Sequence, residues 1–159
     1  MTSADFDPRY GYPPAGSPHG QAGGLGARFF ARLIDGVLIN IVVFVVSLFL
    51  FDRDHWWLVT GLFSGVLMFG YFVLLEVTQG ATLGKRLLGL TVHGPDGASR
   101  PDATQSAIRN SFTLLAVVPY LGPLLAFIAY VVIAVTISGS PTKQGKHDEL
   151  AGGTQVVKG

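Results

Sequence analysis

Long runs of apolar residues dominate the pattern along the chain, and their lengths predict helices that cross a membrane. The first run covers residues 29–51 and the second covers residues 56–77. At about 1.5 Å of rise per residue, each run is long enough to cross the roughly 30 Å hydrocarbon layer of a bilayer. Only residues 52–55 separate the two runs. The pattern therefore predicts two antiparallel, neighbouring transmembrane helices.

A third apolar stretch, residues 112–138, is long for one crossing and short for two. Pro119 and Pro123 interrupt it, and proline breaks a helix because it lacks an amide donor and clashes with the preceding turn. We expect a helix that ends near residue 118, a break, and a second helix over residues 120–138. The two parts form either a hairpin or a single third crossing, and the basic residues favour the hairpin.

Polar segments lie between and beyond these runs. Residues 1–26 are rich in proline and glycine, which predicts a disordered arm ahead of a domain over residues 27–158. Residues 90–93 and 154–157 have strand character. Thr82 and Asp102 are placed to cap short helices.

The composition agrees with a membrane protein. Of the 159 residues, 49% are hydrophobic and 13% are charged, whereas a soluble domain is usually about a quarter charged. A soluble chain of this size would leave too much apolar surface in water. The formal net charge is +1 and no basic stripe is present, so we expect no nucleic-acid partner. The absence of cysteine excludes disulfides, thiolate metal sites and cysteine nucleophiles.

The distribution of lysine and arginine predicts the orientation. Residues 52–55 hold only Arg53, between two aspartates, and ten of the eleven basic residues lie elsewhere. Because positive charge favours the inner face, this connector is expected outside, and the N-terminus and residues 78–110 in the cytoplasm. Lys143, Lys146 and Lys158 place the C-terminus there as well, which requires the hairpin.

Charged residues within the predicted spans indicate a structural or functional role, because inserting one at the centre of a bilayer costs about 2.5–3.5 kcal/mol. Asp35 lies about two turns into the first helix, and Arg28 and Arg32 can share its face. One interpretation is an ion-pair cluster that holds the helix end. The other makes Asp35 a carboxylate that binds protons or cations. Glu76, at the cytoplasmic end of the second helix, has the same two interpretations.

Four residues are placed to contact lipid headgroups. Trp56 and Trp57 lie at the mouth of the second helix, where indoles prefer the interface. Lys85 and Arg86 follow glycines that lack the spacing of a phosphate-binding loop, and they are expected to meet anionic headgroups. The four histidines show no spacing typical of ligands, and no nucleophile motif is present. We therefore expect no metal, no cofactor and no catalytic residue.

Four motifs stand out along the chain: residues 28–35, Glu76 with residues 80–92, residues 107–110 and residues 140–152. In this order they resemble the RDD family, small bacterial integral membrane proteins named for one arginine and two aspartates. The resemblance covers residues 26–158 and assigns the arginine to Arg28 and the aspartates to Asp35 and Asp148. It implies that Asp148 joins the charge cluster and that the two strand segments lie near one another.

The predicted fold is therefore an all-α, multi-pass protein of the bacterial plasma membrane with a small cytoplasmic strand pair. Two functions stay open. The first is a non-catalytic accessory or assembly subunit of a larger membrane complex, such as a respiratory or cell-envelope complex. The second is cation/proton transport by an oligomer through Asp35, an activity that the resemblance suggests. The first is favoured because the charges lie near one leaflet instead of crossing the midplane. The expected partners are the bilayer, other membrane subunits or further copies of the chain.

Overall fold

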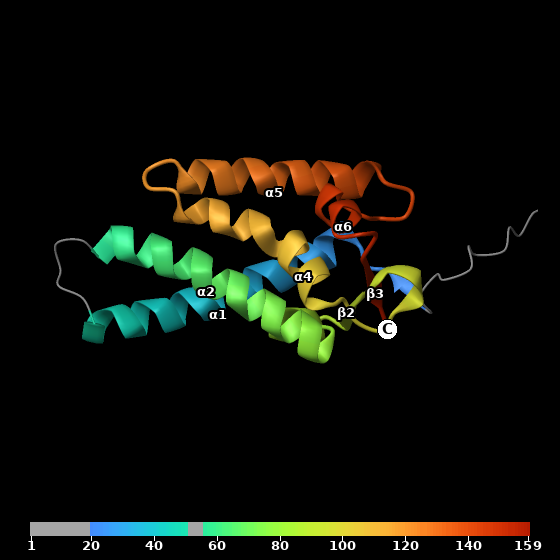
Figure 1. Ribbon diagram of the computed structural model, residues 1–159, viewed down its shortest axis with the longest axis horizontal. Helices are drawn as coiled ribbons and strands as arrows, with labels where there is room; N and C mark the ends of the chain where they lie inside the picture. Colours follow the sequence, from blue (N-terminus) through green and yellow to red (C-terminus); the bar gives the residue numbers. More distant parts are fainter. Residues whose placement is uncertain (1–19, 51–55) are drawn as a thin grey trace, which may run out of the picture.

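The computed structural model describes residues 20–50 and 56–159 and is mostly helical. Figure 1 shows an elongated molecule with long helices along its length and a small sheet at one end. The helices are α1 (Leu25–Leu50), α2 (Trp56–Gln79), α3 (Leu83–Leu87), η2 (Pro95–Gly97), α4 (Ala103–Asn110), η3 (Ser111–Val117), α5 (Gly122–Gly139) and α6 (Lys146–Leu150).

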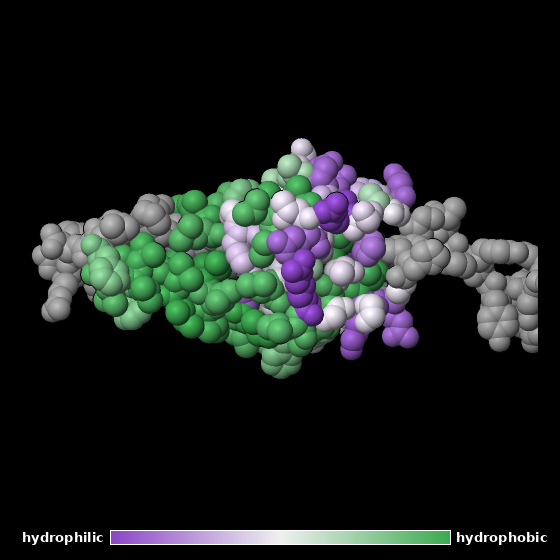
Figure 2. Space-filling model, turned by 90° about the horizontal axis from the view of Figure 1, so that it is seen from below, coloured by the Kyte–Doolittle hydropathy of each residue, from purple (hydrophilic) through white to green (hydrophobic). Residues whose placement is uncertain are grey.

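Two helices in the described part of the chain are long and apolar enough to cross a membrane. They are residues 25–49 of α1 and all of α5, and α2 adds a shorter apolar part over residues 64–79. Figure 2 shows that hydrophobic side chains cover the helical end, whereas hydrophilic ones gather at the sheet end. This separation along the long axis is expected of a protein that passes from an apolar layer into water.

The third apolar stretch folds back on itself as a hairpin. α4 and η3 lead away from the sheet, the chain turns over residues 118–121, and α5 returns beside η3 (Figure 1). Tyr120 takes a left-handed backbone conformation in this turn, with φ of 63°. Gly122 then packs against the carbonyl of Ala116, where a Cβ would overlap it. The predicted break is confirmed, and the hairpin returns the chain to the sheet end.

The first arm of the hairpin tightens from an α-helix to a 3₁₀-helix, which the sequence did not predict. The hydroxyls of Ser111 and Thr113 donate to the carbonyls of Ile108 and Asn110, three residues earlier, both at 2.8 Å. Such side-chain bonds compete with ordinary helical bonds. Gly65 of α2 lies against this segment, and its missing side chain permits the close approach.

The sheet has three antiparallel strands in the order β1 (Gln21–Ala22), β3 (Gln155–Lys158), β2 (Leu90–His93). Val92 lies opposite Val156 in its register, so the predicted pairing of two strands is correct but incomplete. The third strand comes from residues assigned to the disordered arm, so the boundary at residue 26 was placed too late. The amide of Gly23 donates to the Val156 carbonyl at 2.9 Å, which continues the pairing up to the start of α1.

The small core of the sheet end lies between α1 and the strands. Ala31, Leu90, Val92 and Val156 are fully buried together. Residues 1–19 of the predicted arm and the predicted connector over residues 52–55 lie outside the described residues, so their expected conformations stay predictions.

Candidate functional site

Asp35 is fully buried where three helices meet. Its Oδ1 accepts hydrogen bonds from the Tyr71 hydroxyl at 2.7 Å and from the Gly84 amide at 2.8 Å. Its Oδ2 accepts one from the Thr82 hydroxyl at 2.6 Å. Tyr71 lies on α2, whereas Thr82 and Gly84 belong to the cap and first turn of α3. Asp35 therefore fixes α2 and α3 onto α1.

Gly84 is the residue that lets α3 approach α1 so closely. A Cβ at this position would overlap the Ala31 carbonyl and lie 3.0 Å from Cγ of Asp35. Thr82 caps α3 as predicted, because its hydroxyl also accepts from the Lys85 amide at 3.4 Å. One short segment thus presents both an amide and a hydroxyl to the buried carboxylate.

Glu76 forms a second buried centre, near the end of α2. Its Oε1 accepts from the ammonium group of Lys85. Its Oε2 accepts from Ser106 at 3.0 Å and from the amide of Asn110 at 2.9 Å, and Nε of Arg109 lies 4.0 Å away. Glu76 therefore joins α2 to α3 and to the hairpin arm.

Asp148 forms the third centre, on α6. Its Oδ2 accepts from Arg28 at 3.0 Å and from the Gly145 amide at 3.1 Å. Its Oδ1 accepts from Thr154 at 3.3 Å, and Nη2 of Arg109 lies 3.3 Å away. Arg28 also donates to the carbonyls of residues 23 and 156, so this one arginine connects α1 with α6, β3 and the end of β1.

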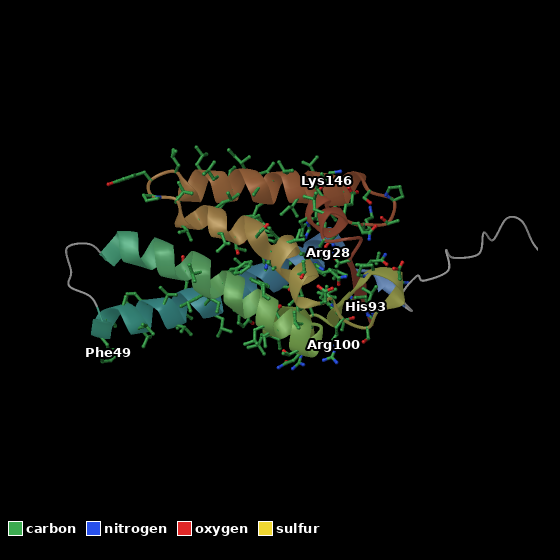
Figure 3. All side chains as sticks on the ribbon, viewed as in Figure 1. Arg28, Phe49, His93, Arg100 and Lys146 are labelled. Carbon is green, nitrogen blue, oxygen red and sulfur yellow. The ribbon has the colours of Figure 1, made fainter. Side chains whose placement is uncertain are left out.

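Two further arginines lie in this region, and one of them connects the second and third centres. Arg109 is 3% exposed and reaches both Glu76 and Asp148. Arg32 lies 3.7 Å from the ring centre of Phe72, a favourable position for a cation over an aromatic face, and donates to Asn110 at 3.0 Å. We call the assembly the polar cluster: Arg28, Arg32, Asp35, Glu76, Lys85, Arg109, Asn110 and Asp148 (Figure 3 labels Arg28).

Burial and neighbouring charges shift three pKa values outside the long helices. Burial lowers the pKa of Lys85 to about 8, against the opposing effect of Glu76. Burial also lowers the pKa of His147 to about 3, and this outweighs the opposing effect of Asp148. Burial acts to raise the pKa of Asp148, but Arg109 and Arg28 outweigh it and hold that pKa below its usual value. At neutral pH the cluster therefore faces an uncharged His147.

The structure brings the five predicted cluster residues together at one end of the molecule, but not with the expected partners. Arg28 binds Asp148, and Arg32 binds Asn110, so neither arginine donates a hydrogen bond to Asp35. The expected pairing within α1 is therefore wrong. Arg28, Arg32 and Asp35 do lie on one face of α1, as their spacing indicates. Donors from α2 and α3 nevertheless approach that face and take the hydrogen bonds of the Asp35 carboxylate.

Lys85 was expected at lipid headgroups and is instead buried, with 6% of its surface exposed. The buried Glu76 carboxylate needs a counter-charge, and the short helix α3 turns Lys85 inward to supply one. The neighbouring Arg86 is exposed, so its predicted headgroup contact stays open. The side chains of Trp56 and Trp57 lie outside the described part of the structure.

The sequence analysis did not predict several partners of the buried carboxylates. They are Tyr71, Ser106, Arg109, Asn110 and His147. A signal existed for two of them. Arg109 and Asn110 are adjacent polar residues at the entrance to an apolar stretch, where burial requires a partner. Ser106 then lies one helical turn before Asn110.

The match to known families agrees with this geometry. The model of the RDD family matches residues 22–152. This chain belongs to the RDD family. The residues that the sequence motifs assigned to the family signature, Arg28, Asp35 and Asp148, all lie in the polar cluster of this RDD protein. No curated protein and no solved structure matches the chain significantly.

The chemistry available to this RDD protein is that of a charged, hydrogen-bonded junction. Within residues 20–50 and 56–159, no three His, Asp or Glu side chains are grouped to hold a metal ion. Membership of the family and two membrane-length apolar helices identify a membrane protein.

Proposed function

We propose that this RDD protein is a non-catalytic integral membrane subunit, an accessory or assembly component of a larger complex in the bacterial plasma membrane. One observation carries the proposal. Each of the three buried carboxylates is held by donors from two or more separate elements. Charges used in this way stabilise one arrangement of helices and are not free to bind and release a substrate.

The surfaces left for function are the outer faces of the long helices. Leu48 and Phe49 of α1 are 65% and 81% exposed, and Leu124 and Val135 of α5 are 55% and 65% exposed. In a bilayer such faces meet acyl chains or the transmembrane helices of other subunits. A small protein with a rigid polar end and apolar outer faces suits packing against larger partners.

The proposal includes an orientation. α1 and α2 cross the membrane, and the hairpin of η3 and α5 enters and leaves from the face that carries the sheet. That face is cytoplasmic, because the basic residues at the sheet end outnumber those near the opposite end. All three strands then lie on the cytoplasmic side.

Co-purification tests this function. The tagged protein, expressed at native level and extracted in mild detergent, should elute with a fixed set of larger membrane proteins. Val135→Trp adds bulk to the outer face of α5 and should reduce their recovery, whereas Val135→Ile should not. Elution of the chain alone, in wild type and both variants, would contradict the proposal.

Transport through Asp35 is the second candidate, and one observation favours it. The hydrogen bonds that Asp35 accepts come from neutral donors, and ionisable residues within membrane helices often mark ion or proton pathways. Against it, the polar cluster lies at one end of α1, far from Phe49 at the other end (Figure 3). We expect protein in liposomes to show no cation-driven proton movement. A movement that Asp35→Asn abolishes would place transport first.

A further inference from the structure

A cavity of about 850 Å³ lies between α1 and α5, next to the polar cluster. Its volume falls in the usual range for sites that bind small molecules. Apolar side chains from both helices form most of its walls, among them Leu33, Val37, Ile41, Phe44, Phe127 and Val131. Those walls suit a hydrocarbon chain.

The polar end of the same cavity holds donors that have no acceptor. Nη1 of Arg32 and Nη1 of Arg109 are buried and make no hydrogen bond to any described residue. Both arginines line the cavity, and Arg109 is 3% exposed. A buried donor without an acceptor is costly, more so when it is charged, so these two groups indicate a missing anionic acceptor.

The formal charges of the polar cluster lead to the same conclusion. Four cationic side chains face three carboxylates, which leaves one positive charge in excess, and the neighbouring His147 is neutral at pH 7. The cations are Arg28, Arg32, Lys85 and Arg109, and the carboxylates are Asp35, Glu76 and Asp148. An unbalanced charge in a poorly hydrated site is unfavourable, and one monoanion would balance it.

We propose that this cavity binds one anionic phospholipid, with its phosphodiester on Arg32 and Arg109 and an acyl chain along the walls of α1 and α5. An anionic phospholipid such as phosphatidylglycerol has a net charge of −1, which is the charge that the cluster lacks, and its phosphodiester oxygens accept from the guanidinium groups of both arginines. In phosphatidylcholine the ammonium group of the headgroup cancels the charge of the same phosphodiester. Basic pockets between membrane helices suit lipid headgroups for the same reasons. A free anion would leave the apolar walls uncovered, and an apolar helix would leave the arginines without an acceptor.

Binding to the purified full-length protein tests the proposal. Phosphatidylglycerol, added in detergent, should raise the unfolding temperature and remain bound in native mass spectrometry, whereas phosphatidylcholine should do so about tenfold more weakly. Val37→Trp fills the cavity from a lipid-facing position of α1 and should abolish the preference. Val42→Trp, on the same helix but outside the cavity, should keep it.

A second pair of variants examines the headgroup. Arg32→Gln should weaken phosphatidylglycerol binding roughly tenfold, and Arg32→Lys should recover part of that loss, because it keeps the charge without the fork of donors. Equal binding of the two lipids, or equal behaviour of Val37→Trp and Val42→Trp, would overturn the proposal. So would inorganic phosphate stabilising the protein as well as the lipid does, or a homodimer that only Val37→Trp disrupts.

Discussion

At the scale of single residues, each of the three carboxylates buried in the described part of the chain accepts hydrogen bonds from donors in other segments. Asp148 shows this most clearly. Arg28 lies 120 positions away in the sequence, yet its guanidinium donates to Asp148 at 3.0 Å. Removing one partner of a buried pair leaves an uncompensated charge and typically costs about 3–5 kcal/mol. The Arg28–Asp148 pair therefore holds α6, near the C-terminus, against the start of α1.

The buried His147 is expected to make the stability of the fold depend on pH. Burial lowers the pKa of His147 to about 3 in the folded protein, from about 6.5 in an unfolded chain, with Arg109, Arg32 and Arg28 adding to the shift and Asp148 opposing it. Between those values only the unfolded chain takes up the proton. Stability is therefore expected to fall on acidification, by up to about 1.4 kcal/mol per pH unit.

Thermal unfolding in detergent between pH 4.5 and 6.5 measures this dependence. The unfolding temperature of the wild type should fall more steeply with acid than that of His147→Asn. Burial acts to raise the pKa of Asp148, but Arg109 and Arg28 hold it below its usual value, so Asp148 stays ionised in the folded protein across this window. Parallel curves for the two proteins would show that His147 is not the group responsible.

At the scale of elements, the contact between α3 and α1 depends on a glycine. Gly84→Ala should destabilise the protein by roughly 2 kcal/mol or more, because the added Cβ overlaps the Ala31 carbonyl and separates the amide from Asp35. Gly70→Ala on α2 is the matched control, since a Cβ there meets nothing within 4 Å and alanine favours a helix. The amount of folded protein in membranes and its unfolding temperature should fall only for Gly84→Ala. Equal behaviour of the two variants would show that the close approach is unimportant.

Elements that depend on local sequence were predictable. Runs of apolar residues marked the long helices, and Pro119 with Pro123 marked the turn of the hairpin. Asp102 was expected to cap a helix, and its side chain does accept from the Gln105 amide at 2.8 Å. Thr82 likewise caps α3. In each case the information lies within a few residues of the feature.

Elements and contacts that depend on distant partners were not predictable in detail. Strand β1 forms by pairing with the edge of β3, which is more than 130 residues away in the sequence. The local sequence of the arm carries no sign of this pairing, so the arm was predicted to be disordered. Lys85 looked like a surface residue because its sequence neighbours give no sign of the buried Glu76. The shared helix face of Arg28, Arg32 and Asp35 was visible, but the group that each arginine binds, Asp148 for Arg28 and Asn110 for Arg32, lies more than 70 residues away.

At the scale of the whole molecule, two helical hairpins extend from one polar end. The ends of α1 and α2 away from the sheet lie on the same side as the turn between η3 and α5 (Figure 1). The strands, α3 and α6 all gather at the other end around the polar cluster. In a membrane, this arrangement places the sheet and the tail on one face and the hairpin turn toward the other.

Labelling of single cysteines in intact cells tests this arrangement most directly, because the natural chain has none. Leu121→Cys lies in the exposed turn before α5, whereas Asp96→Cys and Lys158→Cys lie at exposed positions of the sheet end. A maleimide that cannot cross membranes should label Leu121→Cys from outside, and the other two only after permeabilisation. Labelling of Lys158→Cys from outside, with Leu121→Cys protected until permeabilisation, would show that α5 makes a single third crossing. That result would contradict the hairpin and the cytoplasmic position of the sheet.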